Sequence, residues 1–211
     1  MPDSDSEGRD DPAAAFRQSD KENLMKKAFP IALMLVGLVF VGSGIYTVSR
    51  GFDAKNEVKD ELVAQSITTP SDASIPNVQV KDAATAESMA RIIDHHARDA
   101  AGGKTYAELG RYLAPDGSPE GTNDASAAVK GADGKPVANP VRNTAFQASA
   151  LQTSLWSSVL AFNVSDLVIG LGFMILVLGL AVGGVGVALG GLAIPALSRK
   201  LHVDPVAAHP V

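Results

Sequence analysis

The stretch LVIGLGFMILVLGLAVGGVGVALGGLAI, residues 167–194, contains no charged side chain. A helix needs about 20 predominantly apolar residues to cross the roughly 30 Å hydrocarbon core of a bilayer. This stretch is longer than that requirement, so we expect a membrane-spanning helix that is tilted or protrudes from the lipid.

A second uncharged stretch, AFPIALMLVGLVFVGSGIYTV, covers residues 28–48. Pro30 is expected in the first turn of its helix, where a missing N–H does little harm. A cleaved signal peptide is the alternative, but its apolar region usually has about 7–15 residues and stands closer to the N-terminus. We therefore interpret residues 28–48 as an uncleaved membrane anchor.

Two apolar stretches define the expected fold class. We predict an all-α membrane protein in which two transmembrane helices form an extended helical hairpin with a small extracytoplasmic helical insertion. The expected segments, listed by residue number, are a disordered cytoplasmic tail (1–27), the two transmembrane helices (28–48 and 167–194), the segment between them (49–166) and a second cytoplasmic tail (195–211).

The distribution of positive charge predicts the orientation. Basic residues flank the outer ends of the two spans: Lys21, Lys26, Lys27, Arg199 and Lys200. Near the membrane, the segment between the spans has only Arg50 and Lys55 on one side and the acidic Asp166 on the other. Cytoplasmic flanks carry the excess of Lys and Arg. We therefore expect both termini in the cytoplasm of a two-pass cell-membrane protein, with residues 49–166 extracytoplasmic.

Glycines recur along one side of the second span. The series, in which four members form two G-x-x-x-G pairs seven residues apart, is Gly172, Gly179, Gly183, Gly186 and Gly190. A seven-residue repeat stays on one side of a helix, and small residues let membrane helices pack closely. We predict that this strip is a helix-packing surface. Its partner is the first span, through Gly37, Gly42, Ser43 and Gly44, a second copy of the chain, or a different protein.

The segment between the spans has local helix signals. Residues 52–66 are expected to extend the first helix, with Val58 and Leu62 on an apolar side. A second helix is predicted from Asp82, its cap, to Ala101, ended by two glycines. Helical spacing predicts that the inner face of this helix consists of Met89, Ile92, Ile93, His96 and Ala100.

The remainder of this segment is less regular. Thr105 and Glu108 match a capping box and predict a short helix to about Leu113. Residues 114–140 have almost no large apolar side chains, which predicts a mobile loop. Residues 142–162 are expected to be helical and continuous with the second span, and the side chains expected near one side are Phe146, Leu151, Leu155 and Val159.

The run Ile92-Ile93-Asp94-His95-His96 resembles the signature of the DHH phosphoesterases, whose two-metal centre uses Asp and His. That chemistry needs several further carboxylates. The family's upstream metal motif is absent, and adjacent residues of a helix point about 100° apart. Of the other histidines, His202 and His209 are separated from this run by the membrane. We therefore predict no metal site.

Other functional classes lack a signal. The chain has no Cys, which excludes disulfides and thiol nucleophiles, and its formal net charge of −5 gives nucleic-acid binding no support. No nucleophile elbow, H-E-x-x-H motif or phosphate-binding loop occurs. We predict that the protein is not an enzyme, with no catalytic residues and no cofactor.

Three segments resemble a family of uncharacterised actinobacterial membrane proteins with two spans. They are AQSITTP (64–70), GGKTYAE (102–108) and AFNVSDLVIG (161–170). Some similar proteins carry the label aromatic ring-opening dioxygenase, an activity that requires iron bound by two His and a carboxylate in a buried pocket. The residues of this chain do not predict such a pocket, so the resemblance implies the architecture and a bacterial cell membrane alone.

These observations favour a non-catalytic accessory or scaffold membrane protein. Its expected partners are the lipid bilayer and either further copies of itself or other integral membrane subunits, which it would contact through the glycine-rich face. The alternative is an extracytoplasmic binding or sensing module for a lipid, envelope component or ion, with residues 114–140 as a lid. Whether His95 and His96 bind anything stays open at this point.

Overall fold

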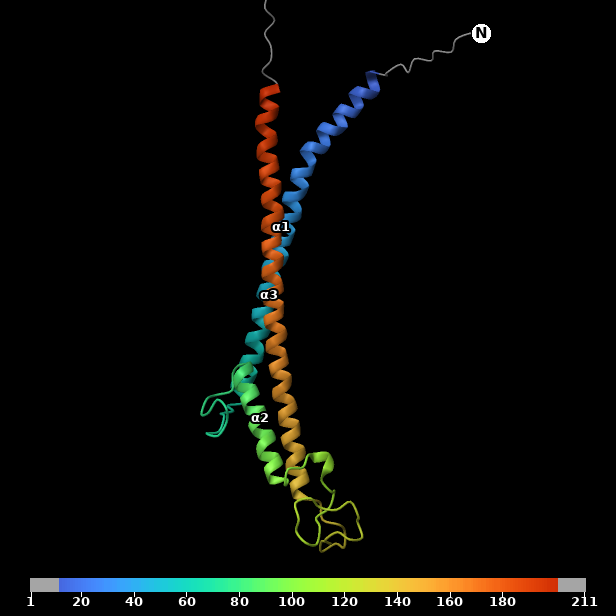
Figure 1. Ribbon diagram of the computed structural model, residues 1–211, viewed down its shortest axis with the longest axis vertical. Helices are drawn as coiled ribbons and strands as arrows, with labels where there is room; N and C mark the ends of the chain where they lie inside the picture. The colour runs from blue at the N-terminus through green and yellow to red at the C-terminus, as the bar shows by residue number, and fades with distance from the viewer. Residues whose placement is uncertain (1–11, 201–211) are drawn as a thin grey trace, which may run out of the picture. The chain divides into compact units, whose positions relative to one another are not determined.

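A computed structural model describes the backbone of residues 12–200 and the side chains of residues 28–191 (Figure 1). It contains three α-helices, α1 (Pro12–Ala64), α2 (Ala83–Ala100) and α3 (Pro140–Lys200), and one short 3-10 helix, η1 (Tyr106–Glu108). The described residues form no strand, only isolated β-bridges. The predicted all-α fold class is therefore confirmed.

Two of these helices are long and apolar enough to cross a membrane, over Ala28–Ala64 in α1 and Pro140–Gly191 in α3. The chain divides into two compact units. We call Met1–Ser49 with Gly170–Val211 the span unit, and Arg50–Ile169 the middle unit. Both α1 and α3 contribute to each unit. This confirms that the helix of residues 142–162 is continuous with the second span.

The two predicted tails are partly helical. Helix α1 begins at Pro12, so the predicted disorder of residues 1–27 is wrong from there onward, and residues 1–11 lie outside the described residues. Pro30 consequently lies inside α1 and not in a first turn. The alanines at 13–15 and the Lys and Glu residues that follow favour helix, which explains the early start. Helix α3 continues through Pro195 to Lys200, and the rest of that tail is not described.

Helix α2 matches its prediction closely. Asp82 caps its N-terminus by accepting the N–H of Thr85 at 2.8 Å. At its C-terminus Gly102 adopts a positive φ of 65°, and the Gly103 N–H donates to Arg98 O at 2.8 Å. This pairing is a Schellman motif, for which a glycine suits the left-handed position.

The capping box at Thr105 is present, since its N–H and hydroxyl both donate to Glu108 Oε2, at 2.8 and 2.7 Å. The helix that it opens is a single 3-10 turn and is shorter than predicted, because η1 ends at Glu108 and the chain from Gly110 pairs with other loop residues. Tyr112 forms antiparallel bridges with Thr122 and Ala138. Competing backbone pairs therefore replaced the rest of the local helix.

Residues 114–140 were predicted to be a mobile loop. They form no helix before Pro140, but they contain backbone pairs such as Leu113 N to Val137 O and Val129 N to Leu113 O, at 2.9 and 3.0 Å. Mobility stays a prediction, and these hydrogen bonds argue against it. Backbone pairing supplies here the order that apolar burial cannot.

The core of the middle unit lies between α2 and the adjacent parts of α1 and α3. Its buried members are Leu62, Val80, Ala86, Ala90, Leu155, Val159 and Phe162. The predicted inner face of α2 is correct for Met89, Ile92 and Ile93, which are buried or half-buried. It is wrong for Ala100 and His96, which are exposed, because the true face is rotated toward small residues. Phe146 and Leu151 are likewise exposed.

Candidate functional site

In the span unit, the glycine strip of α3 faces α1. A methyl group on Gly179 would lie 2.6 Å from the N atom of Val41 and 2.8 Å from the carbonyl O of Gly37. A methyl group on Gly172 would lie 2.8 Å from the N atom of Val48. Real side-chain carbons do not approach backbone atoms this closely, so only glycine permits the contact.

The other three predicted glycines continue the same contact. A methyl group on Gly186 would meet Met34 N and Pro30 O at 2.9 Å, and one on Gly190 would meet the end of the Met34 side chain. A methyl group on Gly183 would lie 3.7 Å from the Cα of Gly37. The structure therefore brings all five residues together against the first span, one of the three partners left open by the sequence.

On α1, two of the four proposed contact residues carry this interface. A methyl group on Gly37 would lie 2.5 Å from Gly183 Cα, and one on Gly44 would lie 2.7 Å from Leu176 N. Gly42 has nothing within 4 Å of its would-be Cβ, so it faces away. The interface thus uses the α1 glycines that are seven residues apart.

Gly51 was missed by the sequence reasoning. Within the middle unit, a methyl group on Gly51 would lie 2.6 Å from Ile169 Cγ1 and 3.2 Å from Ser165 O. Gly51 follows Gly44 by seven residues, so the heptad spacing that identified the strip on α3 would have found it on α1. The nearby Lys55 Nζ pairs with Asp166 Oδ1 at 2.6 Å, which adds an ionic contact between α1 and α3.

The histidines of α2 lie on its exposed surface. His96 Nε2 is 2.7 Å from Asp72 Oδ2, and His95 Nε2 is 3.3 Å from Asp99 Oδ2. The hydrogen bond from His96 holds the pKa of the Asp72 carboxyl below its usual value of 3.8. Among the described residues no three His, Asp or Glu side chains are close enough to hold a metal ion. His95 and His96 therefore form two separate pairs on the surface, each with a different carboxylate.

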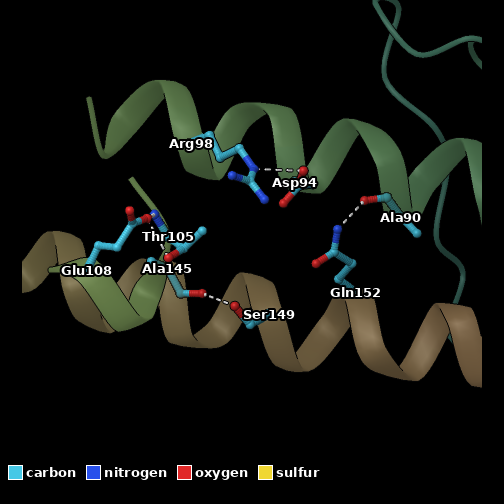
Figure 2. Close-up of polar contacts among 8 residues, drawn as sticks. All are labelled: Ala90, Asp94, Arg98, Thr105, Glu108, Ala145, Ser149 and Gln152. Carbon is cyan, nitrogen blue, oxygen red and sulfur yellow. Dashed lines mark hydrogen bonds and ion pairs between the residues drawn. The ribbon is translucent and has the colours of Figure 1, made fainter. Parts of the chain in front are cut away.

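Figure 2 shows polar contacts of α2 and α3 within the middle unit. Gln152 Nε2 donates to Ala90 O at 3.4 Å, the one contact drawn there that bridges the two helices. Asp94 and Arg98 pair at 2.9 Å within α2, and the Ser149 hydroxyl donates to Ala145 O at 2.8 Å within α3. Most polar side chains here are thus satisfied within their own helix.

The N-terminus of α3 is tied to the loop by one buried side chain. Asn139 Nδ2 donates to Gly110 O at 3.2 Å and to Pro119 O at 3.1 Å, while its Oδ1 accepts the N–H of Val141 at 3.0 Å. Asn139 is 2% exposed. It therefore acts both as a helix cap and as the anchor of two loop segments, at Gly110 and Pro119, a role the sequence analysis did not identify.

A groove of about 800 Å³ opens on the middle unit between the three helices. Its lining includes apolar side chains from all of them, and Glu57 and Glu61 from α1. Sequence reasoning did not find this groove, because it depends on how the helices pack.

No family model matches the chain, and neither a curated protein nor a solved structure matches it.

Proposed function

We propose that the chain is a non-catalytic accessory or scaffold protein of the cell membrane, which associates with further copies of itself or with other integral membrane subunits. The observation that carries this proposal is the large apolar surface that the two spans leave exposed once the glycine contact has joined them. The glycine contact joins α1 and α3 as one helix pair with their backbones close together, while large apolar side chains face away from that contact. These include Leu38, Val39, Tyr46, Met174 and Val177, each more than half exposed.

The role of the glycine strip differs from the original expectation. Because Gly179 and Gly183 already contact α1, the strip does not offer a free surface to a partner. Partners in the membrane would meet the opposite sides of the two helices. In lipid, close packing and not the hydrophobic effect drives such association.

Photo-crosslinking in native membranes tests this proposal. A photoreactive amino acid replaces Met174, which faces away from the pair, or Leu176, which is half-buried and lies beside Gly44. We expect the first position to form adducts with another protein chain and the second to crosslink within the chain. A protein that forms adducts only with lipid and purifies as a monomer contradicts an accessory role.

The proposed orientation places both termini in the cytoplasm and residues 49–166 outside. The charge distribution supports it, and the resemblance described above supports a bacterial cell membrane. Because the chain has no Cys, single cysteines at Ser4, Ala132 and Ala207 report each region without background. An impermeant maleimide should label Ala132→Cys in intact cells and the other two only after lysis. The opposite labelling pattern refutes this orientation.

A further inference from the structure

We propose that the groove of the middle unit is a docking site for a basic amphipathic helix of a partner protein. The inference rests on the accessory role proposed above and names the surface and the chemistry of the partner. The groove is formed by α1, α2 and α3 within the middle unit and has a volume of about 800 Å³.

The floor of the groove is apolar. Its main contributors are Val58, Leu62, Met89, Ile93, Leu151 and Leu155. Leu62 and Leu155 belong to the core, whereas Leu151 is 55% exposed. Because Leu151 is exposed, the apolar surface of the groove extends from the core to the outside of the unit, which favours an apolar occupant.

The length of the groove suits a short helix. Residues 57–65, at the end of α1 and just beyond it, line one side, and residues 151–161 of α3 line the other. At about 1.5 Å per residue, these stretches extend over roughly 12–15 Å, which corresponds to two to three turns. Amphipathic helices commonly place an apolar face of this kind into a groove between helices.

One edge of the groove is acidic. Glu57 and Glu61 are one turn apart on α1, and among the described side chains neither has a basic group within ion-pair distance. Lys55 and Lys59 lie about 200° around the helix from Glu57, so they face elsewhere. On the opposite wall the Ser157 and Ser158 hydroxyls donate to their own helix, to Thr153 O and Ser154 O. Both carboxylates are exposed and open to solvent, so they are free to pair with cations of an occupant.

Charge also separates this occupant from other candidates. An anionic lipid headgroup would be repelled by Glu57 and Glu61. Helix α2 of a second copy is less suitable, because both of its arginines are already paired, Arg91 with Glu87 and Arg98 with Asp94. A helix of another protein with Lys or Arg one turn apart supplies what is missing.

The test uses the full chain in nanodiscs of zwitterionic lipid and a fluorescent helical peptide of leucine and lysine, roughly 14 residues long. A leucine–glutamate peptide and empty nanodiscs are the controls. We expect E57Q/E61Q to weaken binding of the lysine peptide about tenfold, because it removes both carboxylates that would pair with the ammonium groups of the peptide. Leu151→Ser should weaken binding as well. The matched variant E87Q/D99N removes two acidic groups outside the groove and should bind as the native chain does.

Several results overturn the proposal. Unchanged affinity in E57Q/E61Q, equal binding of the glutamate peptide, or binding no greater than to empty nanodiscs each excludes a basic helix. A chain dimer that excludes the peptide and is lost in E57Q/E61Q assigns the groove to a second copy instead. Circular dichroism and the fluorescence of Trp156, the chain's one tryptophan, verify that each variant is folded.

This outcome is separable from the accessory role. If the photo-crosslinked complexes persist while the peptide ignores Glu57 and Glu61, only the groove proposal fails. If no crosslinked complex forms from position 174, the accessory role fails whatever the peptide does.

Discussion

The span unit and the middle unit use different means to hold the same two helices together. In the span unit the backbones of α1 and α3 meet directly, so that Gly37 leaves no room for even a methyl group against Gly183. In the middle unit the close contact ends at Gly51, and beyond it side chains fill the space, with Phe162 2% exposed and Lys55 paired to Asp166.

The difference follows from the solvent expected around each part. Water drives apolar side chains such as Phe162 into a core, whereas lipid offers no such drive and rewards close contact of small residues. Each of the two long helices therefore packs in two ways along its length. We expect that a substitution in one unit disrupts the packing of that unit alone.

The largest expected effect is at the core of the middle unit. Phe162→Ala should lower the free energy of unfolding of that unit by about 3–5 kcal/mol, because it removes a buried ring and leaves a cavity. Urea unfolding in detergent, followed by the fluorescence of Trp156, measures it. Phe146→Ala is the matched control, since Phe146 is 53% exposed. Equal effects of the two changes would mean that the core is misassigned.

A complementary change acts on the span unit. Gly37→Val should destabilise the helix pair by about 2–3 kcal/mol, because the clash is with backbone that cannot rotate away. The reporter is a disulfide between cysteines at Pro30 and Gly190, whose Cβ positions are 3.8 Å apart, near the usual disulfide spacing. Disulfide formation should slow in Gly37→Val.

Gly42→Val is the control for that experiment, because nothing lies within 4 Å of its Cβ position. It should leave the rate of disulfide formation unchanged. A slower rate in both variants would indicate a general effect of valine and not a specific contact.

A smaller effect is expected where the loop meets α3. Asn139→Ala should destabilise the loop by about 2 kcal/mol, because it removes a helix cap and leaves two carbonyls without their donor. Thermolysin should then cleave residues 110–139 faster. Asn143→Ala, at an exposed position on the first turn of α3, should not change the cleavage rate.

The smallest effect concerns the cap of α2 and depends on pH. Partial burial raises the pKa of the Asp82 carboxyl, but the hydrogen bonds from Thr85 outweigh it and hold the pKa below the usual 3.8. A depressed pKa in the folded state stabilises the protein above the unfolded value, and this contribution is lost as the pH falls through the folded value.

The measurement for Asp82 is thermal unfolding below pH 4. Native protein should lose part of its stability there, whereas Asp82→Asn, which keeps a capping oxygen, should lose less over the same range. Asp82→Ala should lower stability by about 1 kcal/mol at neutral pH. Identical pH profiles for the native protein and Asp82→Asn would show that the carboxylate has no such role.

Most helices could be predicted because their signals are local. Uncharged length identified the apolar parts of α1 and α3, and Asp82 with Gly102 marked the two ends of α2. The short length of the helix after Thr105 could not be predicted from its capping box, since the strand-like pairs of Tyr112 that replace its later part are distant in sequence.

The candidate sites were predictable to different degrees. The five glycines of α3 were visible as a repeat, but their partner was not, because spacing on one helix does not identify the helix opposite. The position of His96 was wrong because apolar spacing gives small residues such as Ala86 and Ala90 little weight, although both are fully buried. The groove depends on tertiary packing, so no periodic pattern in the sequence indicates it.

The glycine contacts recur along the pair, near Met34, at Gly37 and at Gly44. An axial shift of either helix by one turn, about 5.4 Å, would bring side chains on the contact face, such as that of Leu176, to positions that glycine now fills. Sliding of one helix along the other by a turn would therefore require that the two helices first separate. Any signal carried by this pair would have to travel as a tilt of both helices together, a rigid-body motion.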